Sequence, residues 1–271
     1  RPRADRLHPL QSVVVFADVG DIVEAAEGEG LSLRISGEFG AELSGGDDNL
    51  VLRAARALAA EAGVANPNAA LTLEKDLPIA SGIGGGSSDA AAALRALNEL
   101  WALDLDAARM QKVARTLGAD VPVCLGGRTA YMTGAGETWR EMRAPSFAAI
   151  LVNPMKPLST PDVYRRFDAM ELGASFTEQP APDWFEEDIA LTAIAAIGND
   201  LEAPARGLLP DIEAVATALR GTSRVRYAAL SGSGATVFAL CDDSAASEGI
   251  AAALQQQFPE WWVAETILGG A

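Results

Sequence analysis

A glycine-rich stretch at residues 77–89 constrains the fold of this chain more than any other segment. It reads L-P-I-A-S-G-I-G-G-G-S-S-D and leads directly into an Ala-rich segment at residues 90–101. Before it, residues 71–77 alternate leucine with polar residues over most of their length, which is the period of a half-buried strand. After it, apolar residues recur at helical spacing among the alanines. The sequence therefore predicts a strand, a glycine-rich loop and a helix that begins where the loop ends.

The backbone of this loop is suited to binding a phosphate group. Its four glycines, between residues 82 and 86, leave backbone N–H groups unobstructed by side chains. We expect Ser87 and Ser88 to cap the first turn of the helix, whose N-terminus carries partial positive charge. The stretch therefore predicts a phosphate-binding loop. The alternative is a glycine-rich turn that caps a helix without any ligand, although shorter turns with fewer glycines fulfil that role.

Two common phosphate-binding motifs do not fit this stretch. A Walker loop requires Lys-Ser or Lys-Thr after its last glycine, and the chain has Ser87 and Ser88 there. A dinucleotide-binding fingerprint that began at Gly82 would need Gly or Ala at position 87. It would also need an earlier short parallel strand and an acidic residue about 20 residues further on, where Asp106 stands at the start of a predicted helix.

The loop resembles instead the P-x-x-x-G-x-G-x-S-S-[DNA]-A-A loop of the GHMP kinases, the superfamily of galactokinase, homoserine kinase and mevalonate kinase. The resemblance implies an ATP-dependent kinase for a small molecule. A lysine at position 75 would help to offset phosphate charge, with a solvated strand lysine as the alternative. The residues that match the family's nucleotide-binding positions are Asn49, Lys75, Pro78, Ile79, Ala80, Ser81, Gly82, Ile83, Gly84, Gly85, Gly86, Ser87 and Ser88.

Further motifs narrow the resemblance. They are R-A-D-x-x-H at 3–8, D-N-L-V-L-R-A-A-R-A-L at 48–58, G-A-D-V-P-V at 118–123, L-S-T-P-D-V-Y at 158–164, N-D-L-E at 199–202 and S-G-S-G-A at 231–235. Together they are similar to the kinase family that phosphorylates the 2-hydroxyl of 4-diphosphocytidyl-2-C-methyl-D-erythritol in the non-mevalonate isoprenoid pathway. This resemblance implies ATP and Mg²⁺ as cofactors and a cytidine diphosphate-linked methylerythritol as the substrate. The glycine loop alone indicates only the superfamily.

The resemblance also assigns roles outside the loop. Asp120, in the G-A-D-V-P motif, is implied to be the base that receives the proton of the accepting hydroxyl. The alternative is a turn aspartate that binds local N–H groups. Leu7 stands where the family often has a tyrosine that stacks on the cytosine. The resemblance assigns no metal ligand. The residues that match substrate-binding positions are His8, Thr160, Tyr164, Ser233 and Gly234.

One element of the family pattern is missing from the sequence. The family usually pairs the catalytic aspartate with a lysine in an A-x-A-K-x-N segment on its first strand, and the chain starts at Arg1 without that segment. We expect the strand and its lysine to lie upstream of Arg1. Two alternatives stay open: another kinase of the superfamily, of the homoserine or mevalonate kinase type, or a catalytically silent nucleotide-binding module.

Composition excludes several classes of partner. The 37 acidic and 21 basic residues give a net charge of −16, which argues against nucleic acid or an anionic membrane as the main partner. Cys124 and Cys241 form no disulfide framework and indicate a reducing cytoplasm. The single histidine excludes a His-rich metal site, and no apolar run or signal region indicates a membrane span or export. Oligomeric state cannot be predicted.

The order of predicted elements indicates an α+β protein with the two-domain GHMP kinase fold. Residues 1–145 are expected to form a ribosomal-S5-domain-2-like α/β domain, which begins with an antiparallel meander of three strands. A helix should follow a cap at Asp47 or Asp48, and residues 118–127 are predicted as a loop with a short extended piece. Residues 146–271 read strand, helices, two strands, helix, strand, which is typical of a ferredoxin-like domain.

Overall fold

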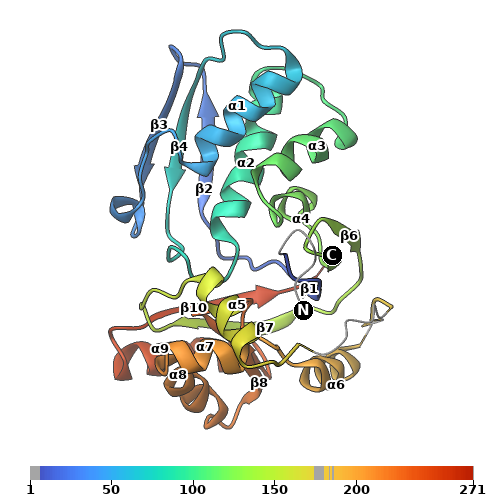
Figure 1. Cartoon of the computed structure of the whole chain (residues 1–271). Helices are drawn as coiled ribbons and strands as arrows, with labels where there is room; N and C mark the ends of the chain where they lie inside the picture. The colour runs from blue at the N-terminus through green and yellow to red at the C-terminus, as the bar shows by residue number, and fades with distance from the viewer. Residues whose placement is uncertain (1–6, 174–179, 183, 185, 271) are drawn as a thin grey trace.

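The N-terminal half combines two small sheets with a layer of helices (Figure 1). It belongs to a computed structural model that describes residues 7–173, 180–182, 184 and 186–270. Its strands are β1 (Leu10–Val14), β2 (Ile22–Ala26), β3 (Leu31–Ser36), β4 (Ala69–Glu74), β5 (Ala130–Gly134) and β6 (Thr138–Glu141). Its helices are α1 (Leu50–Ala62), α2 (Gly85–Leu100), α3 (Ala107–Leu117) and α4 (Val121–Gly126), with a 3₁₀ turn at Gly40–Glu42.

The predicted antiparallel meander of the first three strands is wrong. Strand β4 lies between β2 and β3, antiparallel to β2 and parallel to β3, while β1 pairs with β5 in a separate sheet. The parallel pair is possible because α1 forms the crossover between β3 and β4. Alternation of apolar residues reveals which face of a strand is buried, but it does not reveal the partner strand.

The core of this half lies between the β2–β4–β3 sheet and helices α1 and α2. Alternating burial along β4 places Leu71 and Leu73 on the core face. Helix α2 supplies Leu94 and Leu97, both fully buried, and its alanines allow α1 to approach closely. Helix α1 is therefore held against α2, and α2 against the sheet, so the start of α2 has a fixed position.

The C-terminal half is a four-stranded antiparallel sheet with helices packed on it (Figure 1). Its strands are β7 (Phe147–Asn153), β8 (Val225–Leu230), β9 (Val237–Cys241) and β10 (Trp262–Leu268). Its helices are α5 (Thr160–Ala169), α6 (Glu187–Ile197), α7 (Glu202–Leu208), α8 (Asp211–Arg220) and α9 (Ser244–Gln257). The spatial order β10–β7–β9–β8 is the ferredoxin-like order, which confirms the predicted α+β fold.

The two halves are joined where the chain leaves β1. Ala17 forms an isolated bridge with Leu268, and the Gly269 N–H donates to the Phe16 carbonyl at 3.1 Å. The Asp18 carboxylate accepts a bond from the Ile267 N–H at 2.8 Å. We propose that the boundary between the two domains lies at residue 145, between β6 and β7, with this segment as one of their contacts.

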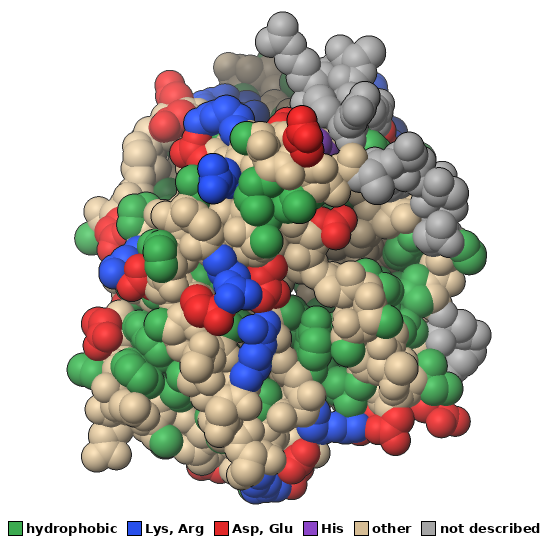
Figure 2. All heavy atoms as spheres, turned by 60° about the horizontal axis from the view of Figure 1, so that its bottom comes forward, with side chains coloured by type: hydrophobic (Ala, Val, Ile, Leu, Met, Phe, Trp, Pro, Cys, Tyr) green, Lys and Arg blue, Asp and Glu red, His purple; other side chains and the backbone are tan. Residues whose placement is uncertain are grey.

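Charged side chains of both signs are interspersed on the face shown in Figure 2. On the C-terminal half, Lys156 pairs with Asp211 at 2.5 Å and Arg220 pairs with Glu202 at 2.9 Å. Such pairs neutralise basic charge locally, so the excess of acidic residues dominates the long-range field. None of the helices in the described residues is long and apolar enough to cross a membrane.

Candidate active site

The glycine loop runs from the end of β4 to the start of α2. Gly84, in the left-handed region at φ 73°, precedes the helix, which begins at Gly85. The predicted capping by Ser87 and Ser88 is wrong, because the helix begins earlier and both serines lie in its first turn. Among the described residues no side chain caps this helix, so the N–H groups of its first turn are available to an anion.

The loop packs against the turn between β8 and β9, backbone against backbone. The Ser231 hydroxyl donates to the Gly82 carbonyl at 3.0 Å, and the Thr236 N–H donates to the Ser81 carbonyl at 3.1 Å. A Cβ on Gly82 would lie 2.4 Å from the carbonyl oxygen of Gly234, and Gly82 has φ 79°. Only glycine allows this approach. The glycine loop and the Ser233–Gly234 turn are therefore in direct contact at the junction of the two halves.

A hydrogen bond between two hydroxyl groups connects the turn between β8 and β9 to α5. The Oγ of Ser233 lies 2.7 Å from the Oγ1 of Thr160, at the first residue of α5. The ring of Tyr164, one turn further along α5, stacks on the ring of His8, with centroids 4.7 Å apart and an interplanar angle of 29°. The predicted substrate-binding residues are thus brought together, although they come from three distant segments.

His8 forms a hydrogen bond with Asp168, a residue that the sequence did not single out. Its Nε2 lies 2.8 Å from the Oδ1 of Asp168, near the end of α5. No motif or spacing distinguishes Asp168 from other surface aspartates. Leu7, the replacement for the family's tyrosine, is 54% exposed. Residues 3–6 of the motif at 3–8 lie outside the described residues.

Asp120 stands at the N-terminus of α4. The predicted loop with an extended piece at 118–127 is wrong, since residues 121–126 form this short helix. Pro122 lies in the first turn of α4, where a residue needs no N–H to donate within the helix. The prediction failed because the apolar residues 121–125, with two β-branched valines, have the local pattern of an extended segment. The guanidinium of Arg95, on α2, donates to the carbonyls of Cys124 and Leu125, each at 3.2 Å. Helix α2 therefore positions both the loop and Asp120.

The carboxyl of Asp120 and the hydroxyl of Tyr164, the aromatic residue of α5, both have a pKa that is raised by burial. Desolvation by surrounding protein raises the pKa of the Asp120 carboxyl, although the residue is accessible to solvent. Burial raises the pKa of the Tyr164 hydroxyl, and the negative charge of Asp120 raises it further. The charge of Asp120, at the N-terminus of α4, therefore acts on Tyr164, on α5. A carboxylate with a raised pKa can accept a proton more readily than an ordinary aspartate.

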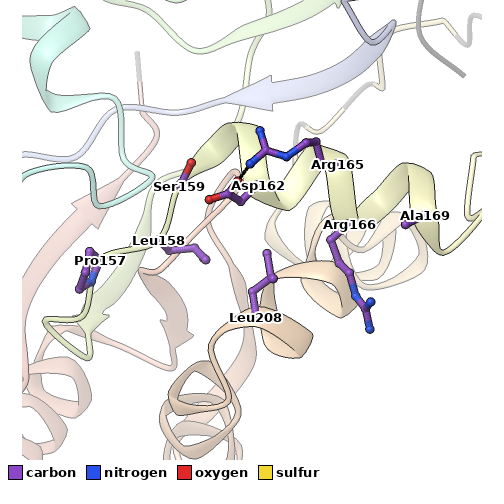
Figure 3. A pocket seen from close by; sticks show the side chains of 8 residues that line it. All are labelled: Pro157, Leu158, Ser159, Asp162, Arg165, Arg166, Ala169 and Leu208. Atoms are coloured by element: carbon purple, nitrogen blue, oxygen red, sulfur yellow. Dashed lines mark ion pairs between the residues drawn. The ribbon is translucent and has the colours of Figure 1, made fainter.

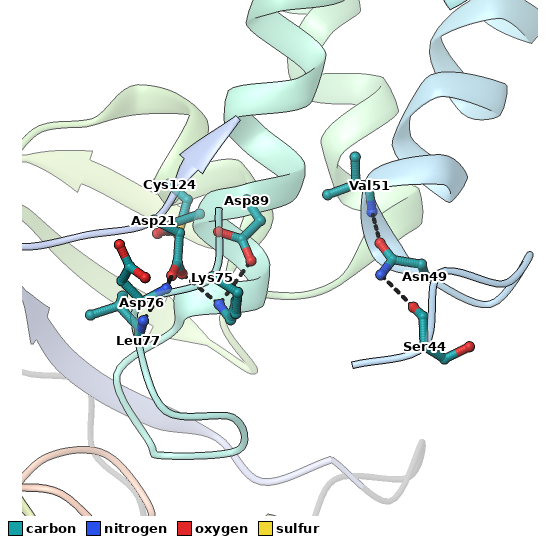
Figure 4. Close-up of polar contacts among 10 residues, drawn as sticks. Asp21, Ser44, Asn49, Val51, Lys75, Asp76, Leu77, Asp89 and Cys124 are labelled. Carbon is teal, nitrogen blue, oxygen red and sulfur yellow. Dashed lines mark hydrogen bonds and ion pairs between the residues drawn. The ribbon is translucent and has the colours of Figure 1, made fainter. Parts of the chain in front are cut away.

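Lys75 is buried in an ion-pair cluster rather than exposed to a ligand or to solvent. Its Nζ lies 2.5 Å from the Oδ2 of Asp21 and 2.9 Å from the Oδ2 of Asp89 (Figure 4). All three side chains are at most 5% exposed. The solvated lysine considered above is therefore wrong, and the positive charge that was expected to offset phosphate is already paired. Sequence reasoning missed Asp21, whose only signal is a charge directly before a strand.

Comparison with known proteins identifies the family. The GHMP kinases N terminal domain profile matches residues 49–128, and the GHMP kinases C terminal profile matches residues 182–260. The 4-diphosphocytidyl-2-C-methyl-D-erythritol kinase of Parvibaculum lavamentivorans is 46% identical over 270 residues, 99% of this chain and 92% of that protein. The protein of the same name from Hyphomonas neptunium is 45% identical over 276 residues, 100% of this chain and 92% of that protein. The chain belongs to the 4-diphosphocytidyl-2-C-methyl-D-erythritol kinase family.

A solved member of the 4-diphosphocytidyl-2-C-methyl-D-erythritol kinase family has the same fold. Its crystal structure superposes with a TM-score of 0.78 at 30% sequence identity and covers 99% of this chain and 93% of that one. The family and the fold predicted from the glycine loop and the dispersed motifs are thereby confirmed.

In this family member, Asn49 serves as the N-cap of α1. Its Oδ1 accepts a bond from the Val51 N–H at 2.9 Å, and its Nδ2 donates to the Ser44 carbonyl at 2.8 Å (Figure 4). The predicted cap at Asp47 or Asp48 is therefore wrong. The side chain is 7% exposed, and its polar atoms are engaged within the protein.

Replacing this cap should destabilise the protein. Because Asn49→Ala removes both bonds, we expect the free energy of unfolding in urea to fall by about 1 to 2 kcal/mol. Asp106→Ala is the matched control. It removes the exposed N-cap of α3, in which the Asp106 carboxylate accepts a bond from the Arg109 N–H, and should lower the free energy of unfolding by about 1 kcal/mol. An unchanged unfolding free energy for Asn49→Ala would contradict a capping role.

The ion-pair cluster also predicts a pH dependence of stability. Burial, opposed by Lys75, raises the pKa of Asp89 from 3.8 to about 7. A group whose pKa is higher in the folded than in the unfolded state stabilises the fold fully at pH values below its unfolded-state pKa. This stabilisation is lost as the pH rises through its folded-state pKa. Between pH 5.5 and 8, the free energy of unfolding of the wild type should therefore fall by about 2 kcal/mol relative to that of Asp89→Asn.

Urea unfolding of both proteins at the two pH values measures this difference. Asp47→Asn, which changes a carboxylate that is 91% exposed, is the control and should parallel the wild type. Parallel curves for Asp89→Asn and the wild type would show that Asp89 does not have the raised pKa.

A cavity of about 480 Å³ lies on the outer face of α5, away from these residues (Figure 3). It is lined by Pro157, Leu158, Ser159, Asp162, Arg165, Arg166, Ala169 and Leu208. Arg165 forms an ion pair with Asp162 across its rim. Neither Thr160 nor Tyr164 lines this cavity, so it is separate from the convergence of the loop, the turn and α5.

Proposed function

We propose that the protein transfers the terminal phosphoryl group of ATP to the 2-hydroxyl of 4-diphosphocytidyl-2-C-methyl-D-erythritol, which yields ADP and the 2-phosphate. Relatives that carry the name of this kinase match nearly the whole chain. The observation that carries the proposal is the set of contacts, in such a chain, that join the 231–236 turn to the glycine loop and to α5, and α4 to the start of α2 through Ser88 and Cys124.

In this proposal the chain acts mainly by positioning and by charge stabilisation. The nucleotide phosphates lie over residues 82–88, where the first-turn amides of α2 and the helix dipole favour negative charge. Asp120 orients the accepting hydroxyl and receives its proton late, because an alcohol is a very weak acid. The Ser233–Gly234 turn closes the site between the loop and α5 and fixes Thr160 beside the acceptor.

For the cytidine end we propose Tyr164 and His8 as the recognition pair. His8 covers one face of the Tyr164 ring, so a base stacks on the opposite face while His8 stays in place. With Nε2 held by Asp168, and Nδ1 in no hydrogen bond to the described residues, Nδ1 is the ring atom of His8 that we propose to bind an edge of the base. Leu7 offers an aliphatic contact at the position where the resemblance implies a tyrosine.

We propose Mg²⁺ as the accompanying metal ion. The described residues contain no cluster of three or more His, Cys, Asp or Glu side chains that could hold a metal by themselves. This fits an ion that is bound chiefly by substrate phosphates and water. When bound, such an ion neutralises charge on the β- and γ-phosphates.

We propose a cytoplasmic enzyme whose partners are small molecules. Both cysteines, Cys124 and Cys241, are free and buried, as suits a reducing compartment. The excess of acidic residues does not favour nucleic acid or an anionic membrane as a partner.

Coupled measurement of ADP release tests the proposed reaction. The protein should release ADP with 4-diphosphocytidyl-2-C-methyl-D-erythritol and stay at the background rate with homoserine and mevalonate. ³¹P NMR of the product should show a new phosphate monoester. Turnover of homoserine or mevalonate instead would refute the substrate assignment. Binding of ATP without turnover of any of the three would indicate a nucleotide-binding module.

A further inference from the structure

The two ends of the glycine loop are tied together by the buried cluster of Asp21, Lys75 and Asp89. The Oδ1 of Asp21 accepts bonds from the N–H groups of Asp76 and Leu77, at 2.7 and 2.8 Å, where the loop begins. Lys75 connects the other carboxylate oxygen of Asp21 to Asp89, which lies in the second turn of α2, where the loop has ended. One chain of bonds therefore connects the two ends of the loop (Figure 4).

The backbone of the loop leaves room for this chain of bonds. A Cβ on Gly85, the first residue of α2, would lie 3.1 Å from the Nζ of Lys75 and 3.4 Å from the Oδ2 of Asp21. Any larger side chain pointing that way would push the ammonium away from its two partners. The first amides of α2 thus lie directly against the cluster.

The charge of the cluster does not suit attraction of a phosphate. Two carboxylates and one ammonium leave a net charge of −1 when both acids are ionised, in a place where an anion is expected. Burying such a group costs free energy, and a buried ion cluster is weak evidence for stability by itself. Its best-attested use is to fix one geometry among alternatives.

We propose that Asp21, Lys75 and Asp89 are positioning residues for ATP. They hold the first turn of α2 at a fixed place relative to the start of the loop, so that its amides converge on the phosphates. The inference rests on the proposed function, and it gives Lys75 a role through the loop rather than a direct contact with the nucleotide. Its neighbours Asp21 and Asp89 then matter for ATP as much as Lys75 does.

A double-mutant cycle on Asp21→Asn and Asp89→Asn tests the proposal. Both changes keep size and an acceptor oxygen, whereas Lys75→Met would leave two buried carboxylates facing each other. Isothermal titration with a non-hydrolysable ATP analogue gives the dissociation constant for each variant. Each single variant should bind about tenfold more weakly, because a displaced binding group loses its geometry. The double variant should be no more than about twofold weaker than the weaker single one, because either change cuts the same chain of bonds.

Three readouts separate positioning from other roles. Tighter binding by either single variant would reveal an electrostatic effect of the lost carboxylate and would overturn the proposal. Losses that multiply in the double variant would show independent sites and would also overturn it. The KM for the alcohol substrate should stay within about twofold of the wild type, because the positioning acts on the nucleotide side.

Controls distinguish this inference from the proposed function. Lys112→Met breaks an exposed pair with Glu61, at 2.7 Å, and should leave the dissociation constant of the analogue unchanged. Circular dichroism and thermal melting check that each variant is folded at the titration temperature. A wild-type protein that does not bind the analogue would refute the proposed function. A wild type that binds it as tightly as both single variants would refute only the inference.

Discussion

Asp120→Asn should lower kcat by about 10³-fold, because a positioned proton acceptor contributes a factor of this order. The amide is similar in size and still accepts a hydrogen bond, but it cannot take the proton of the accepting hydroxyl. The side chain of Asp120 makes no capping bond to α4, so the substitution should cost little stability. The dissociation constant of an ATP analogue should change by less than about twofold, because the proposed phosphate site is the glycine loop and not Asp120.

The pH profile adds a second readout for the same variant. Desolvation raises the pKa of Asp120, so kcat/KM of the wild type should rise with pH through a value above the ordinary range of an aspartate. Asp120→Asn should lack this rise. Asp106→Asn is the matched control, since it changes another aspartate at a helix N-terminus, whose bond to the Arg109 N–H an asparagine can keep. Full turnover by Asp120→Asn would refute the catalytic role.

Gly82→Ala should lower the free energy of unfolding by about 3 kcal/mol. A left-handed backbone costs a residue with a Cβ about 1 to 2 kcal/mol. The new Cβ would also meet the backbone of Gly234 at 2.4 Å, so either the loop or the 231–236 turn must move. Urea unfolding measures the loss. The affinity for the ATP analogue should fall at least about tenfold, because the displaced loop is the proposed phosphate site.

Gly84→Ala is the matched control for this experiment. Gly84 has a similar φ of 73°, and its Cβ would meet nothing within 4 Å. It should cost only the conformational term of about 1 kcal/mol. The difference of about 2 kcal/mol between the two variants then measures the steric cost of a Cβ where the two halves approach closely. Equal losses would mean that this approach does not stabilise the protein.

Local sequence patterns predicted those parts of the site that depend on neighbouring residues. The glycines, the strand before them and the alanines after them act over a few residues, so the loop and its helix could be read directly. The motif at 158–164 likewise contains both Thr160 and Tyr164, and the structure has both on α5. The predictions were weakest where a residue's partner is distant, as with Asp21 and Asp168, because spacing along the chain carries no information on such contacts.

By itself the sequence determined the glycine-rich loop and the helix after it, the family and the ferredoxin-like order of the second half, because each follows from local periodicity, turn chemistry or motif. Only the tertiary structure decided that β4 lies between β2 and β3, that residues 121–126 are a helix, and that Lys75 is paired internally. The physical reason is that strand partners and buried charges are selected by packing between distant segments. A lysine that contacts a bound phosphate and a lysine that is paired with buried carboxylates can have the same local sequence, and only the fold distinguishes them.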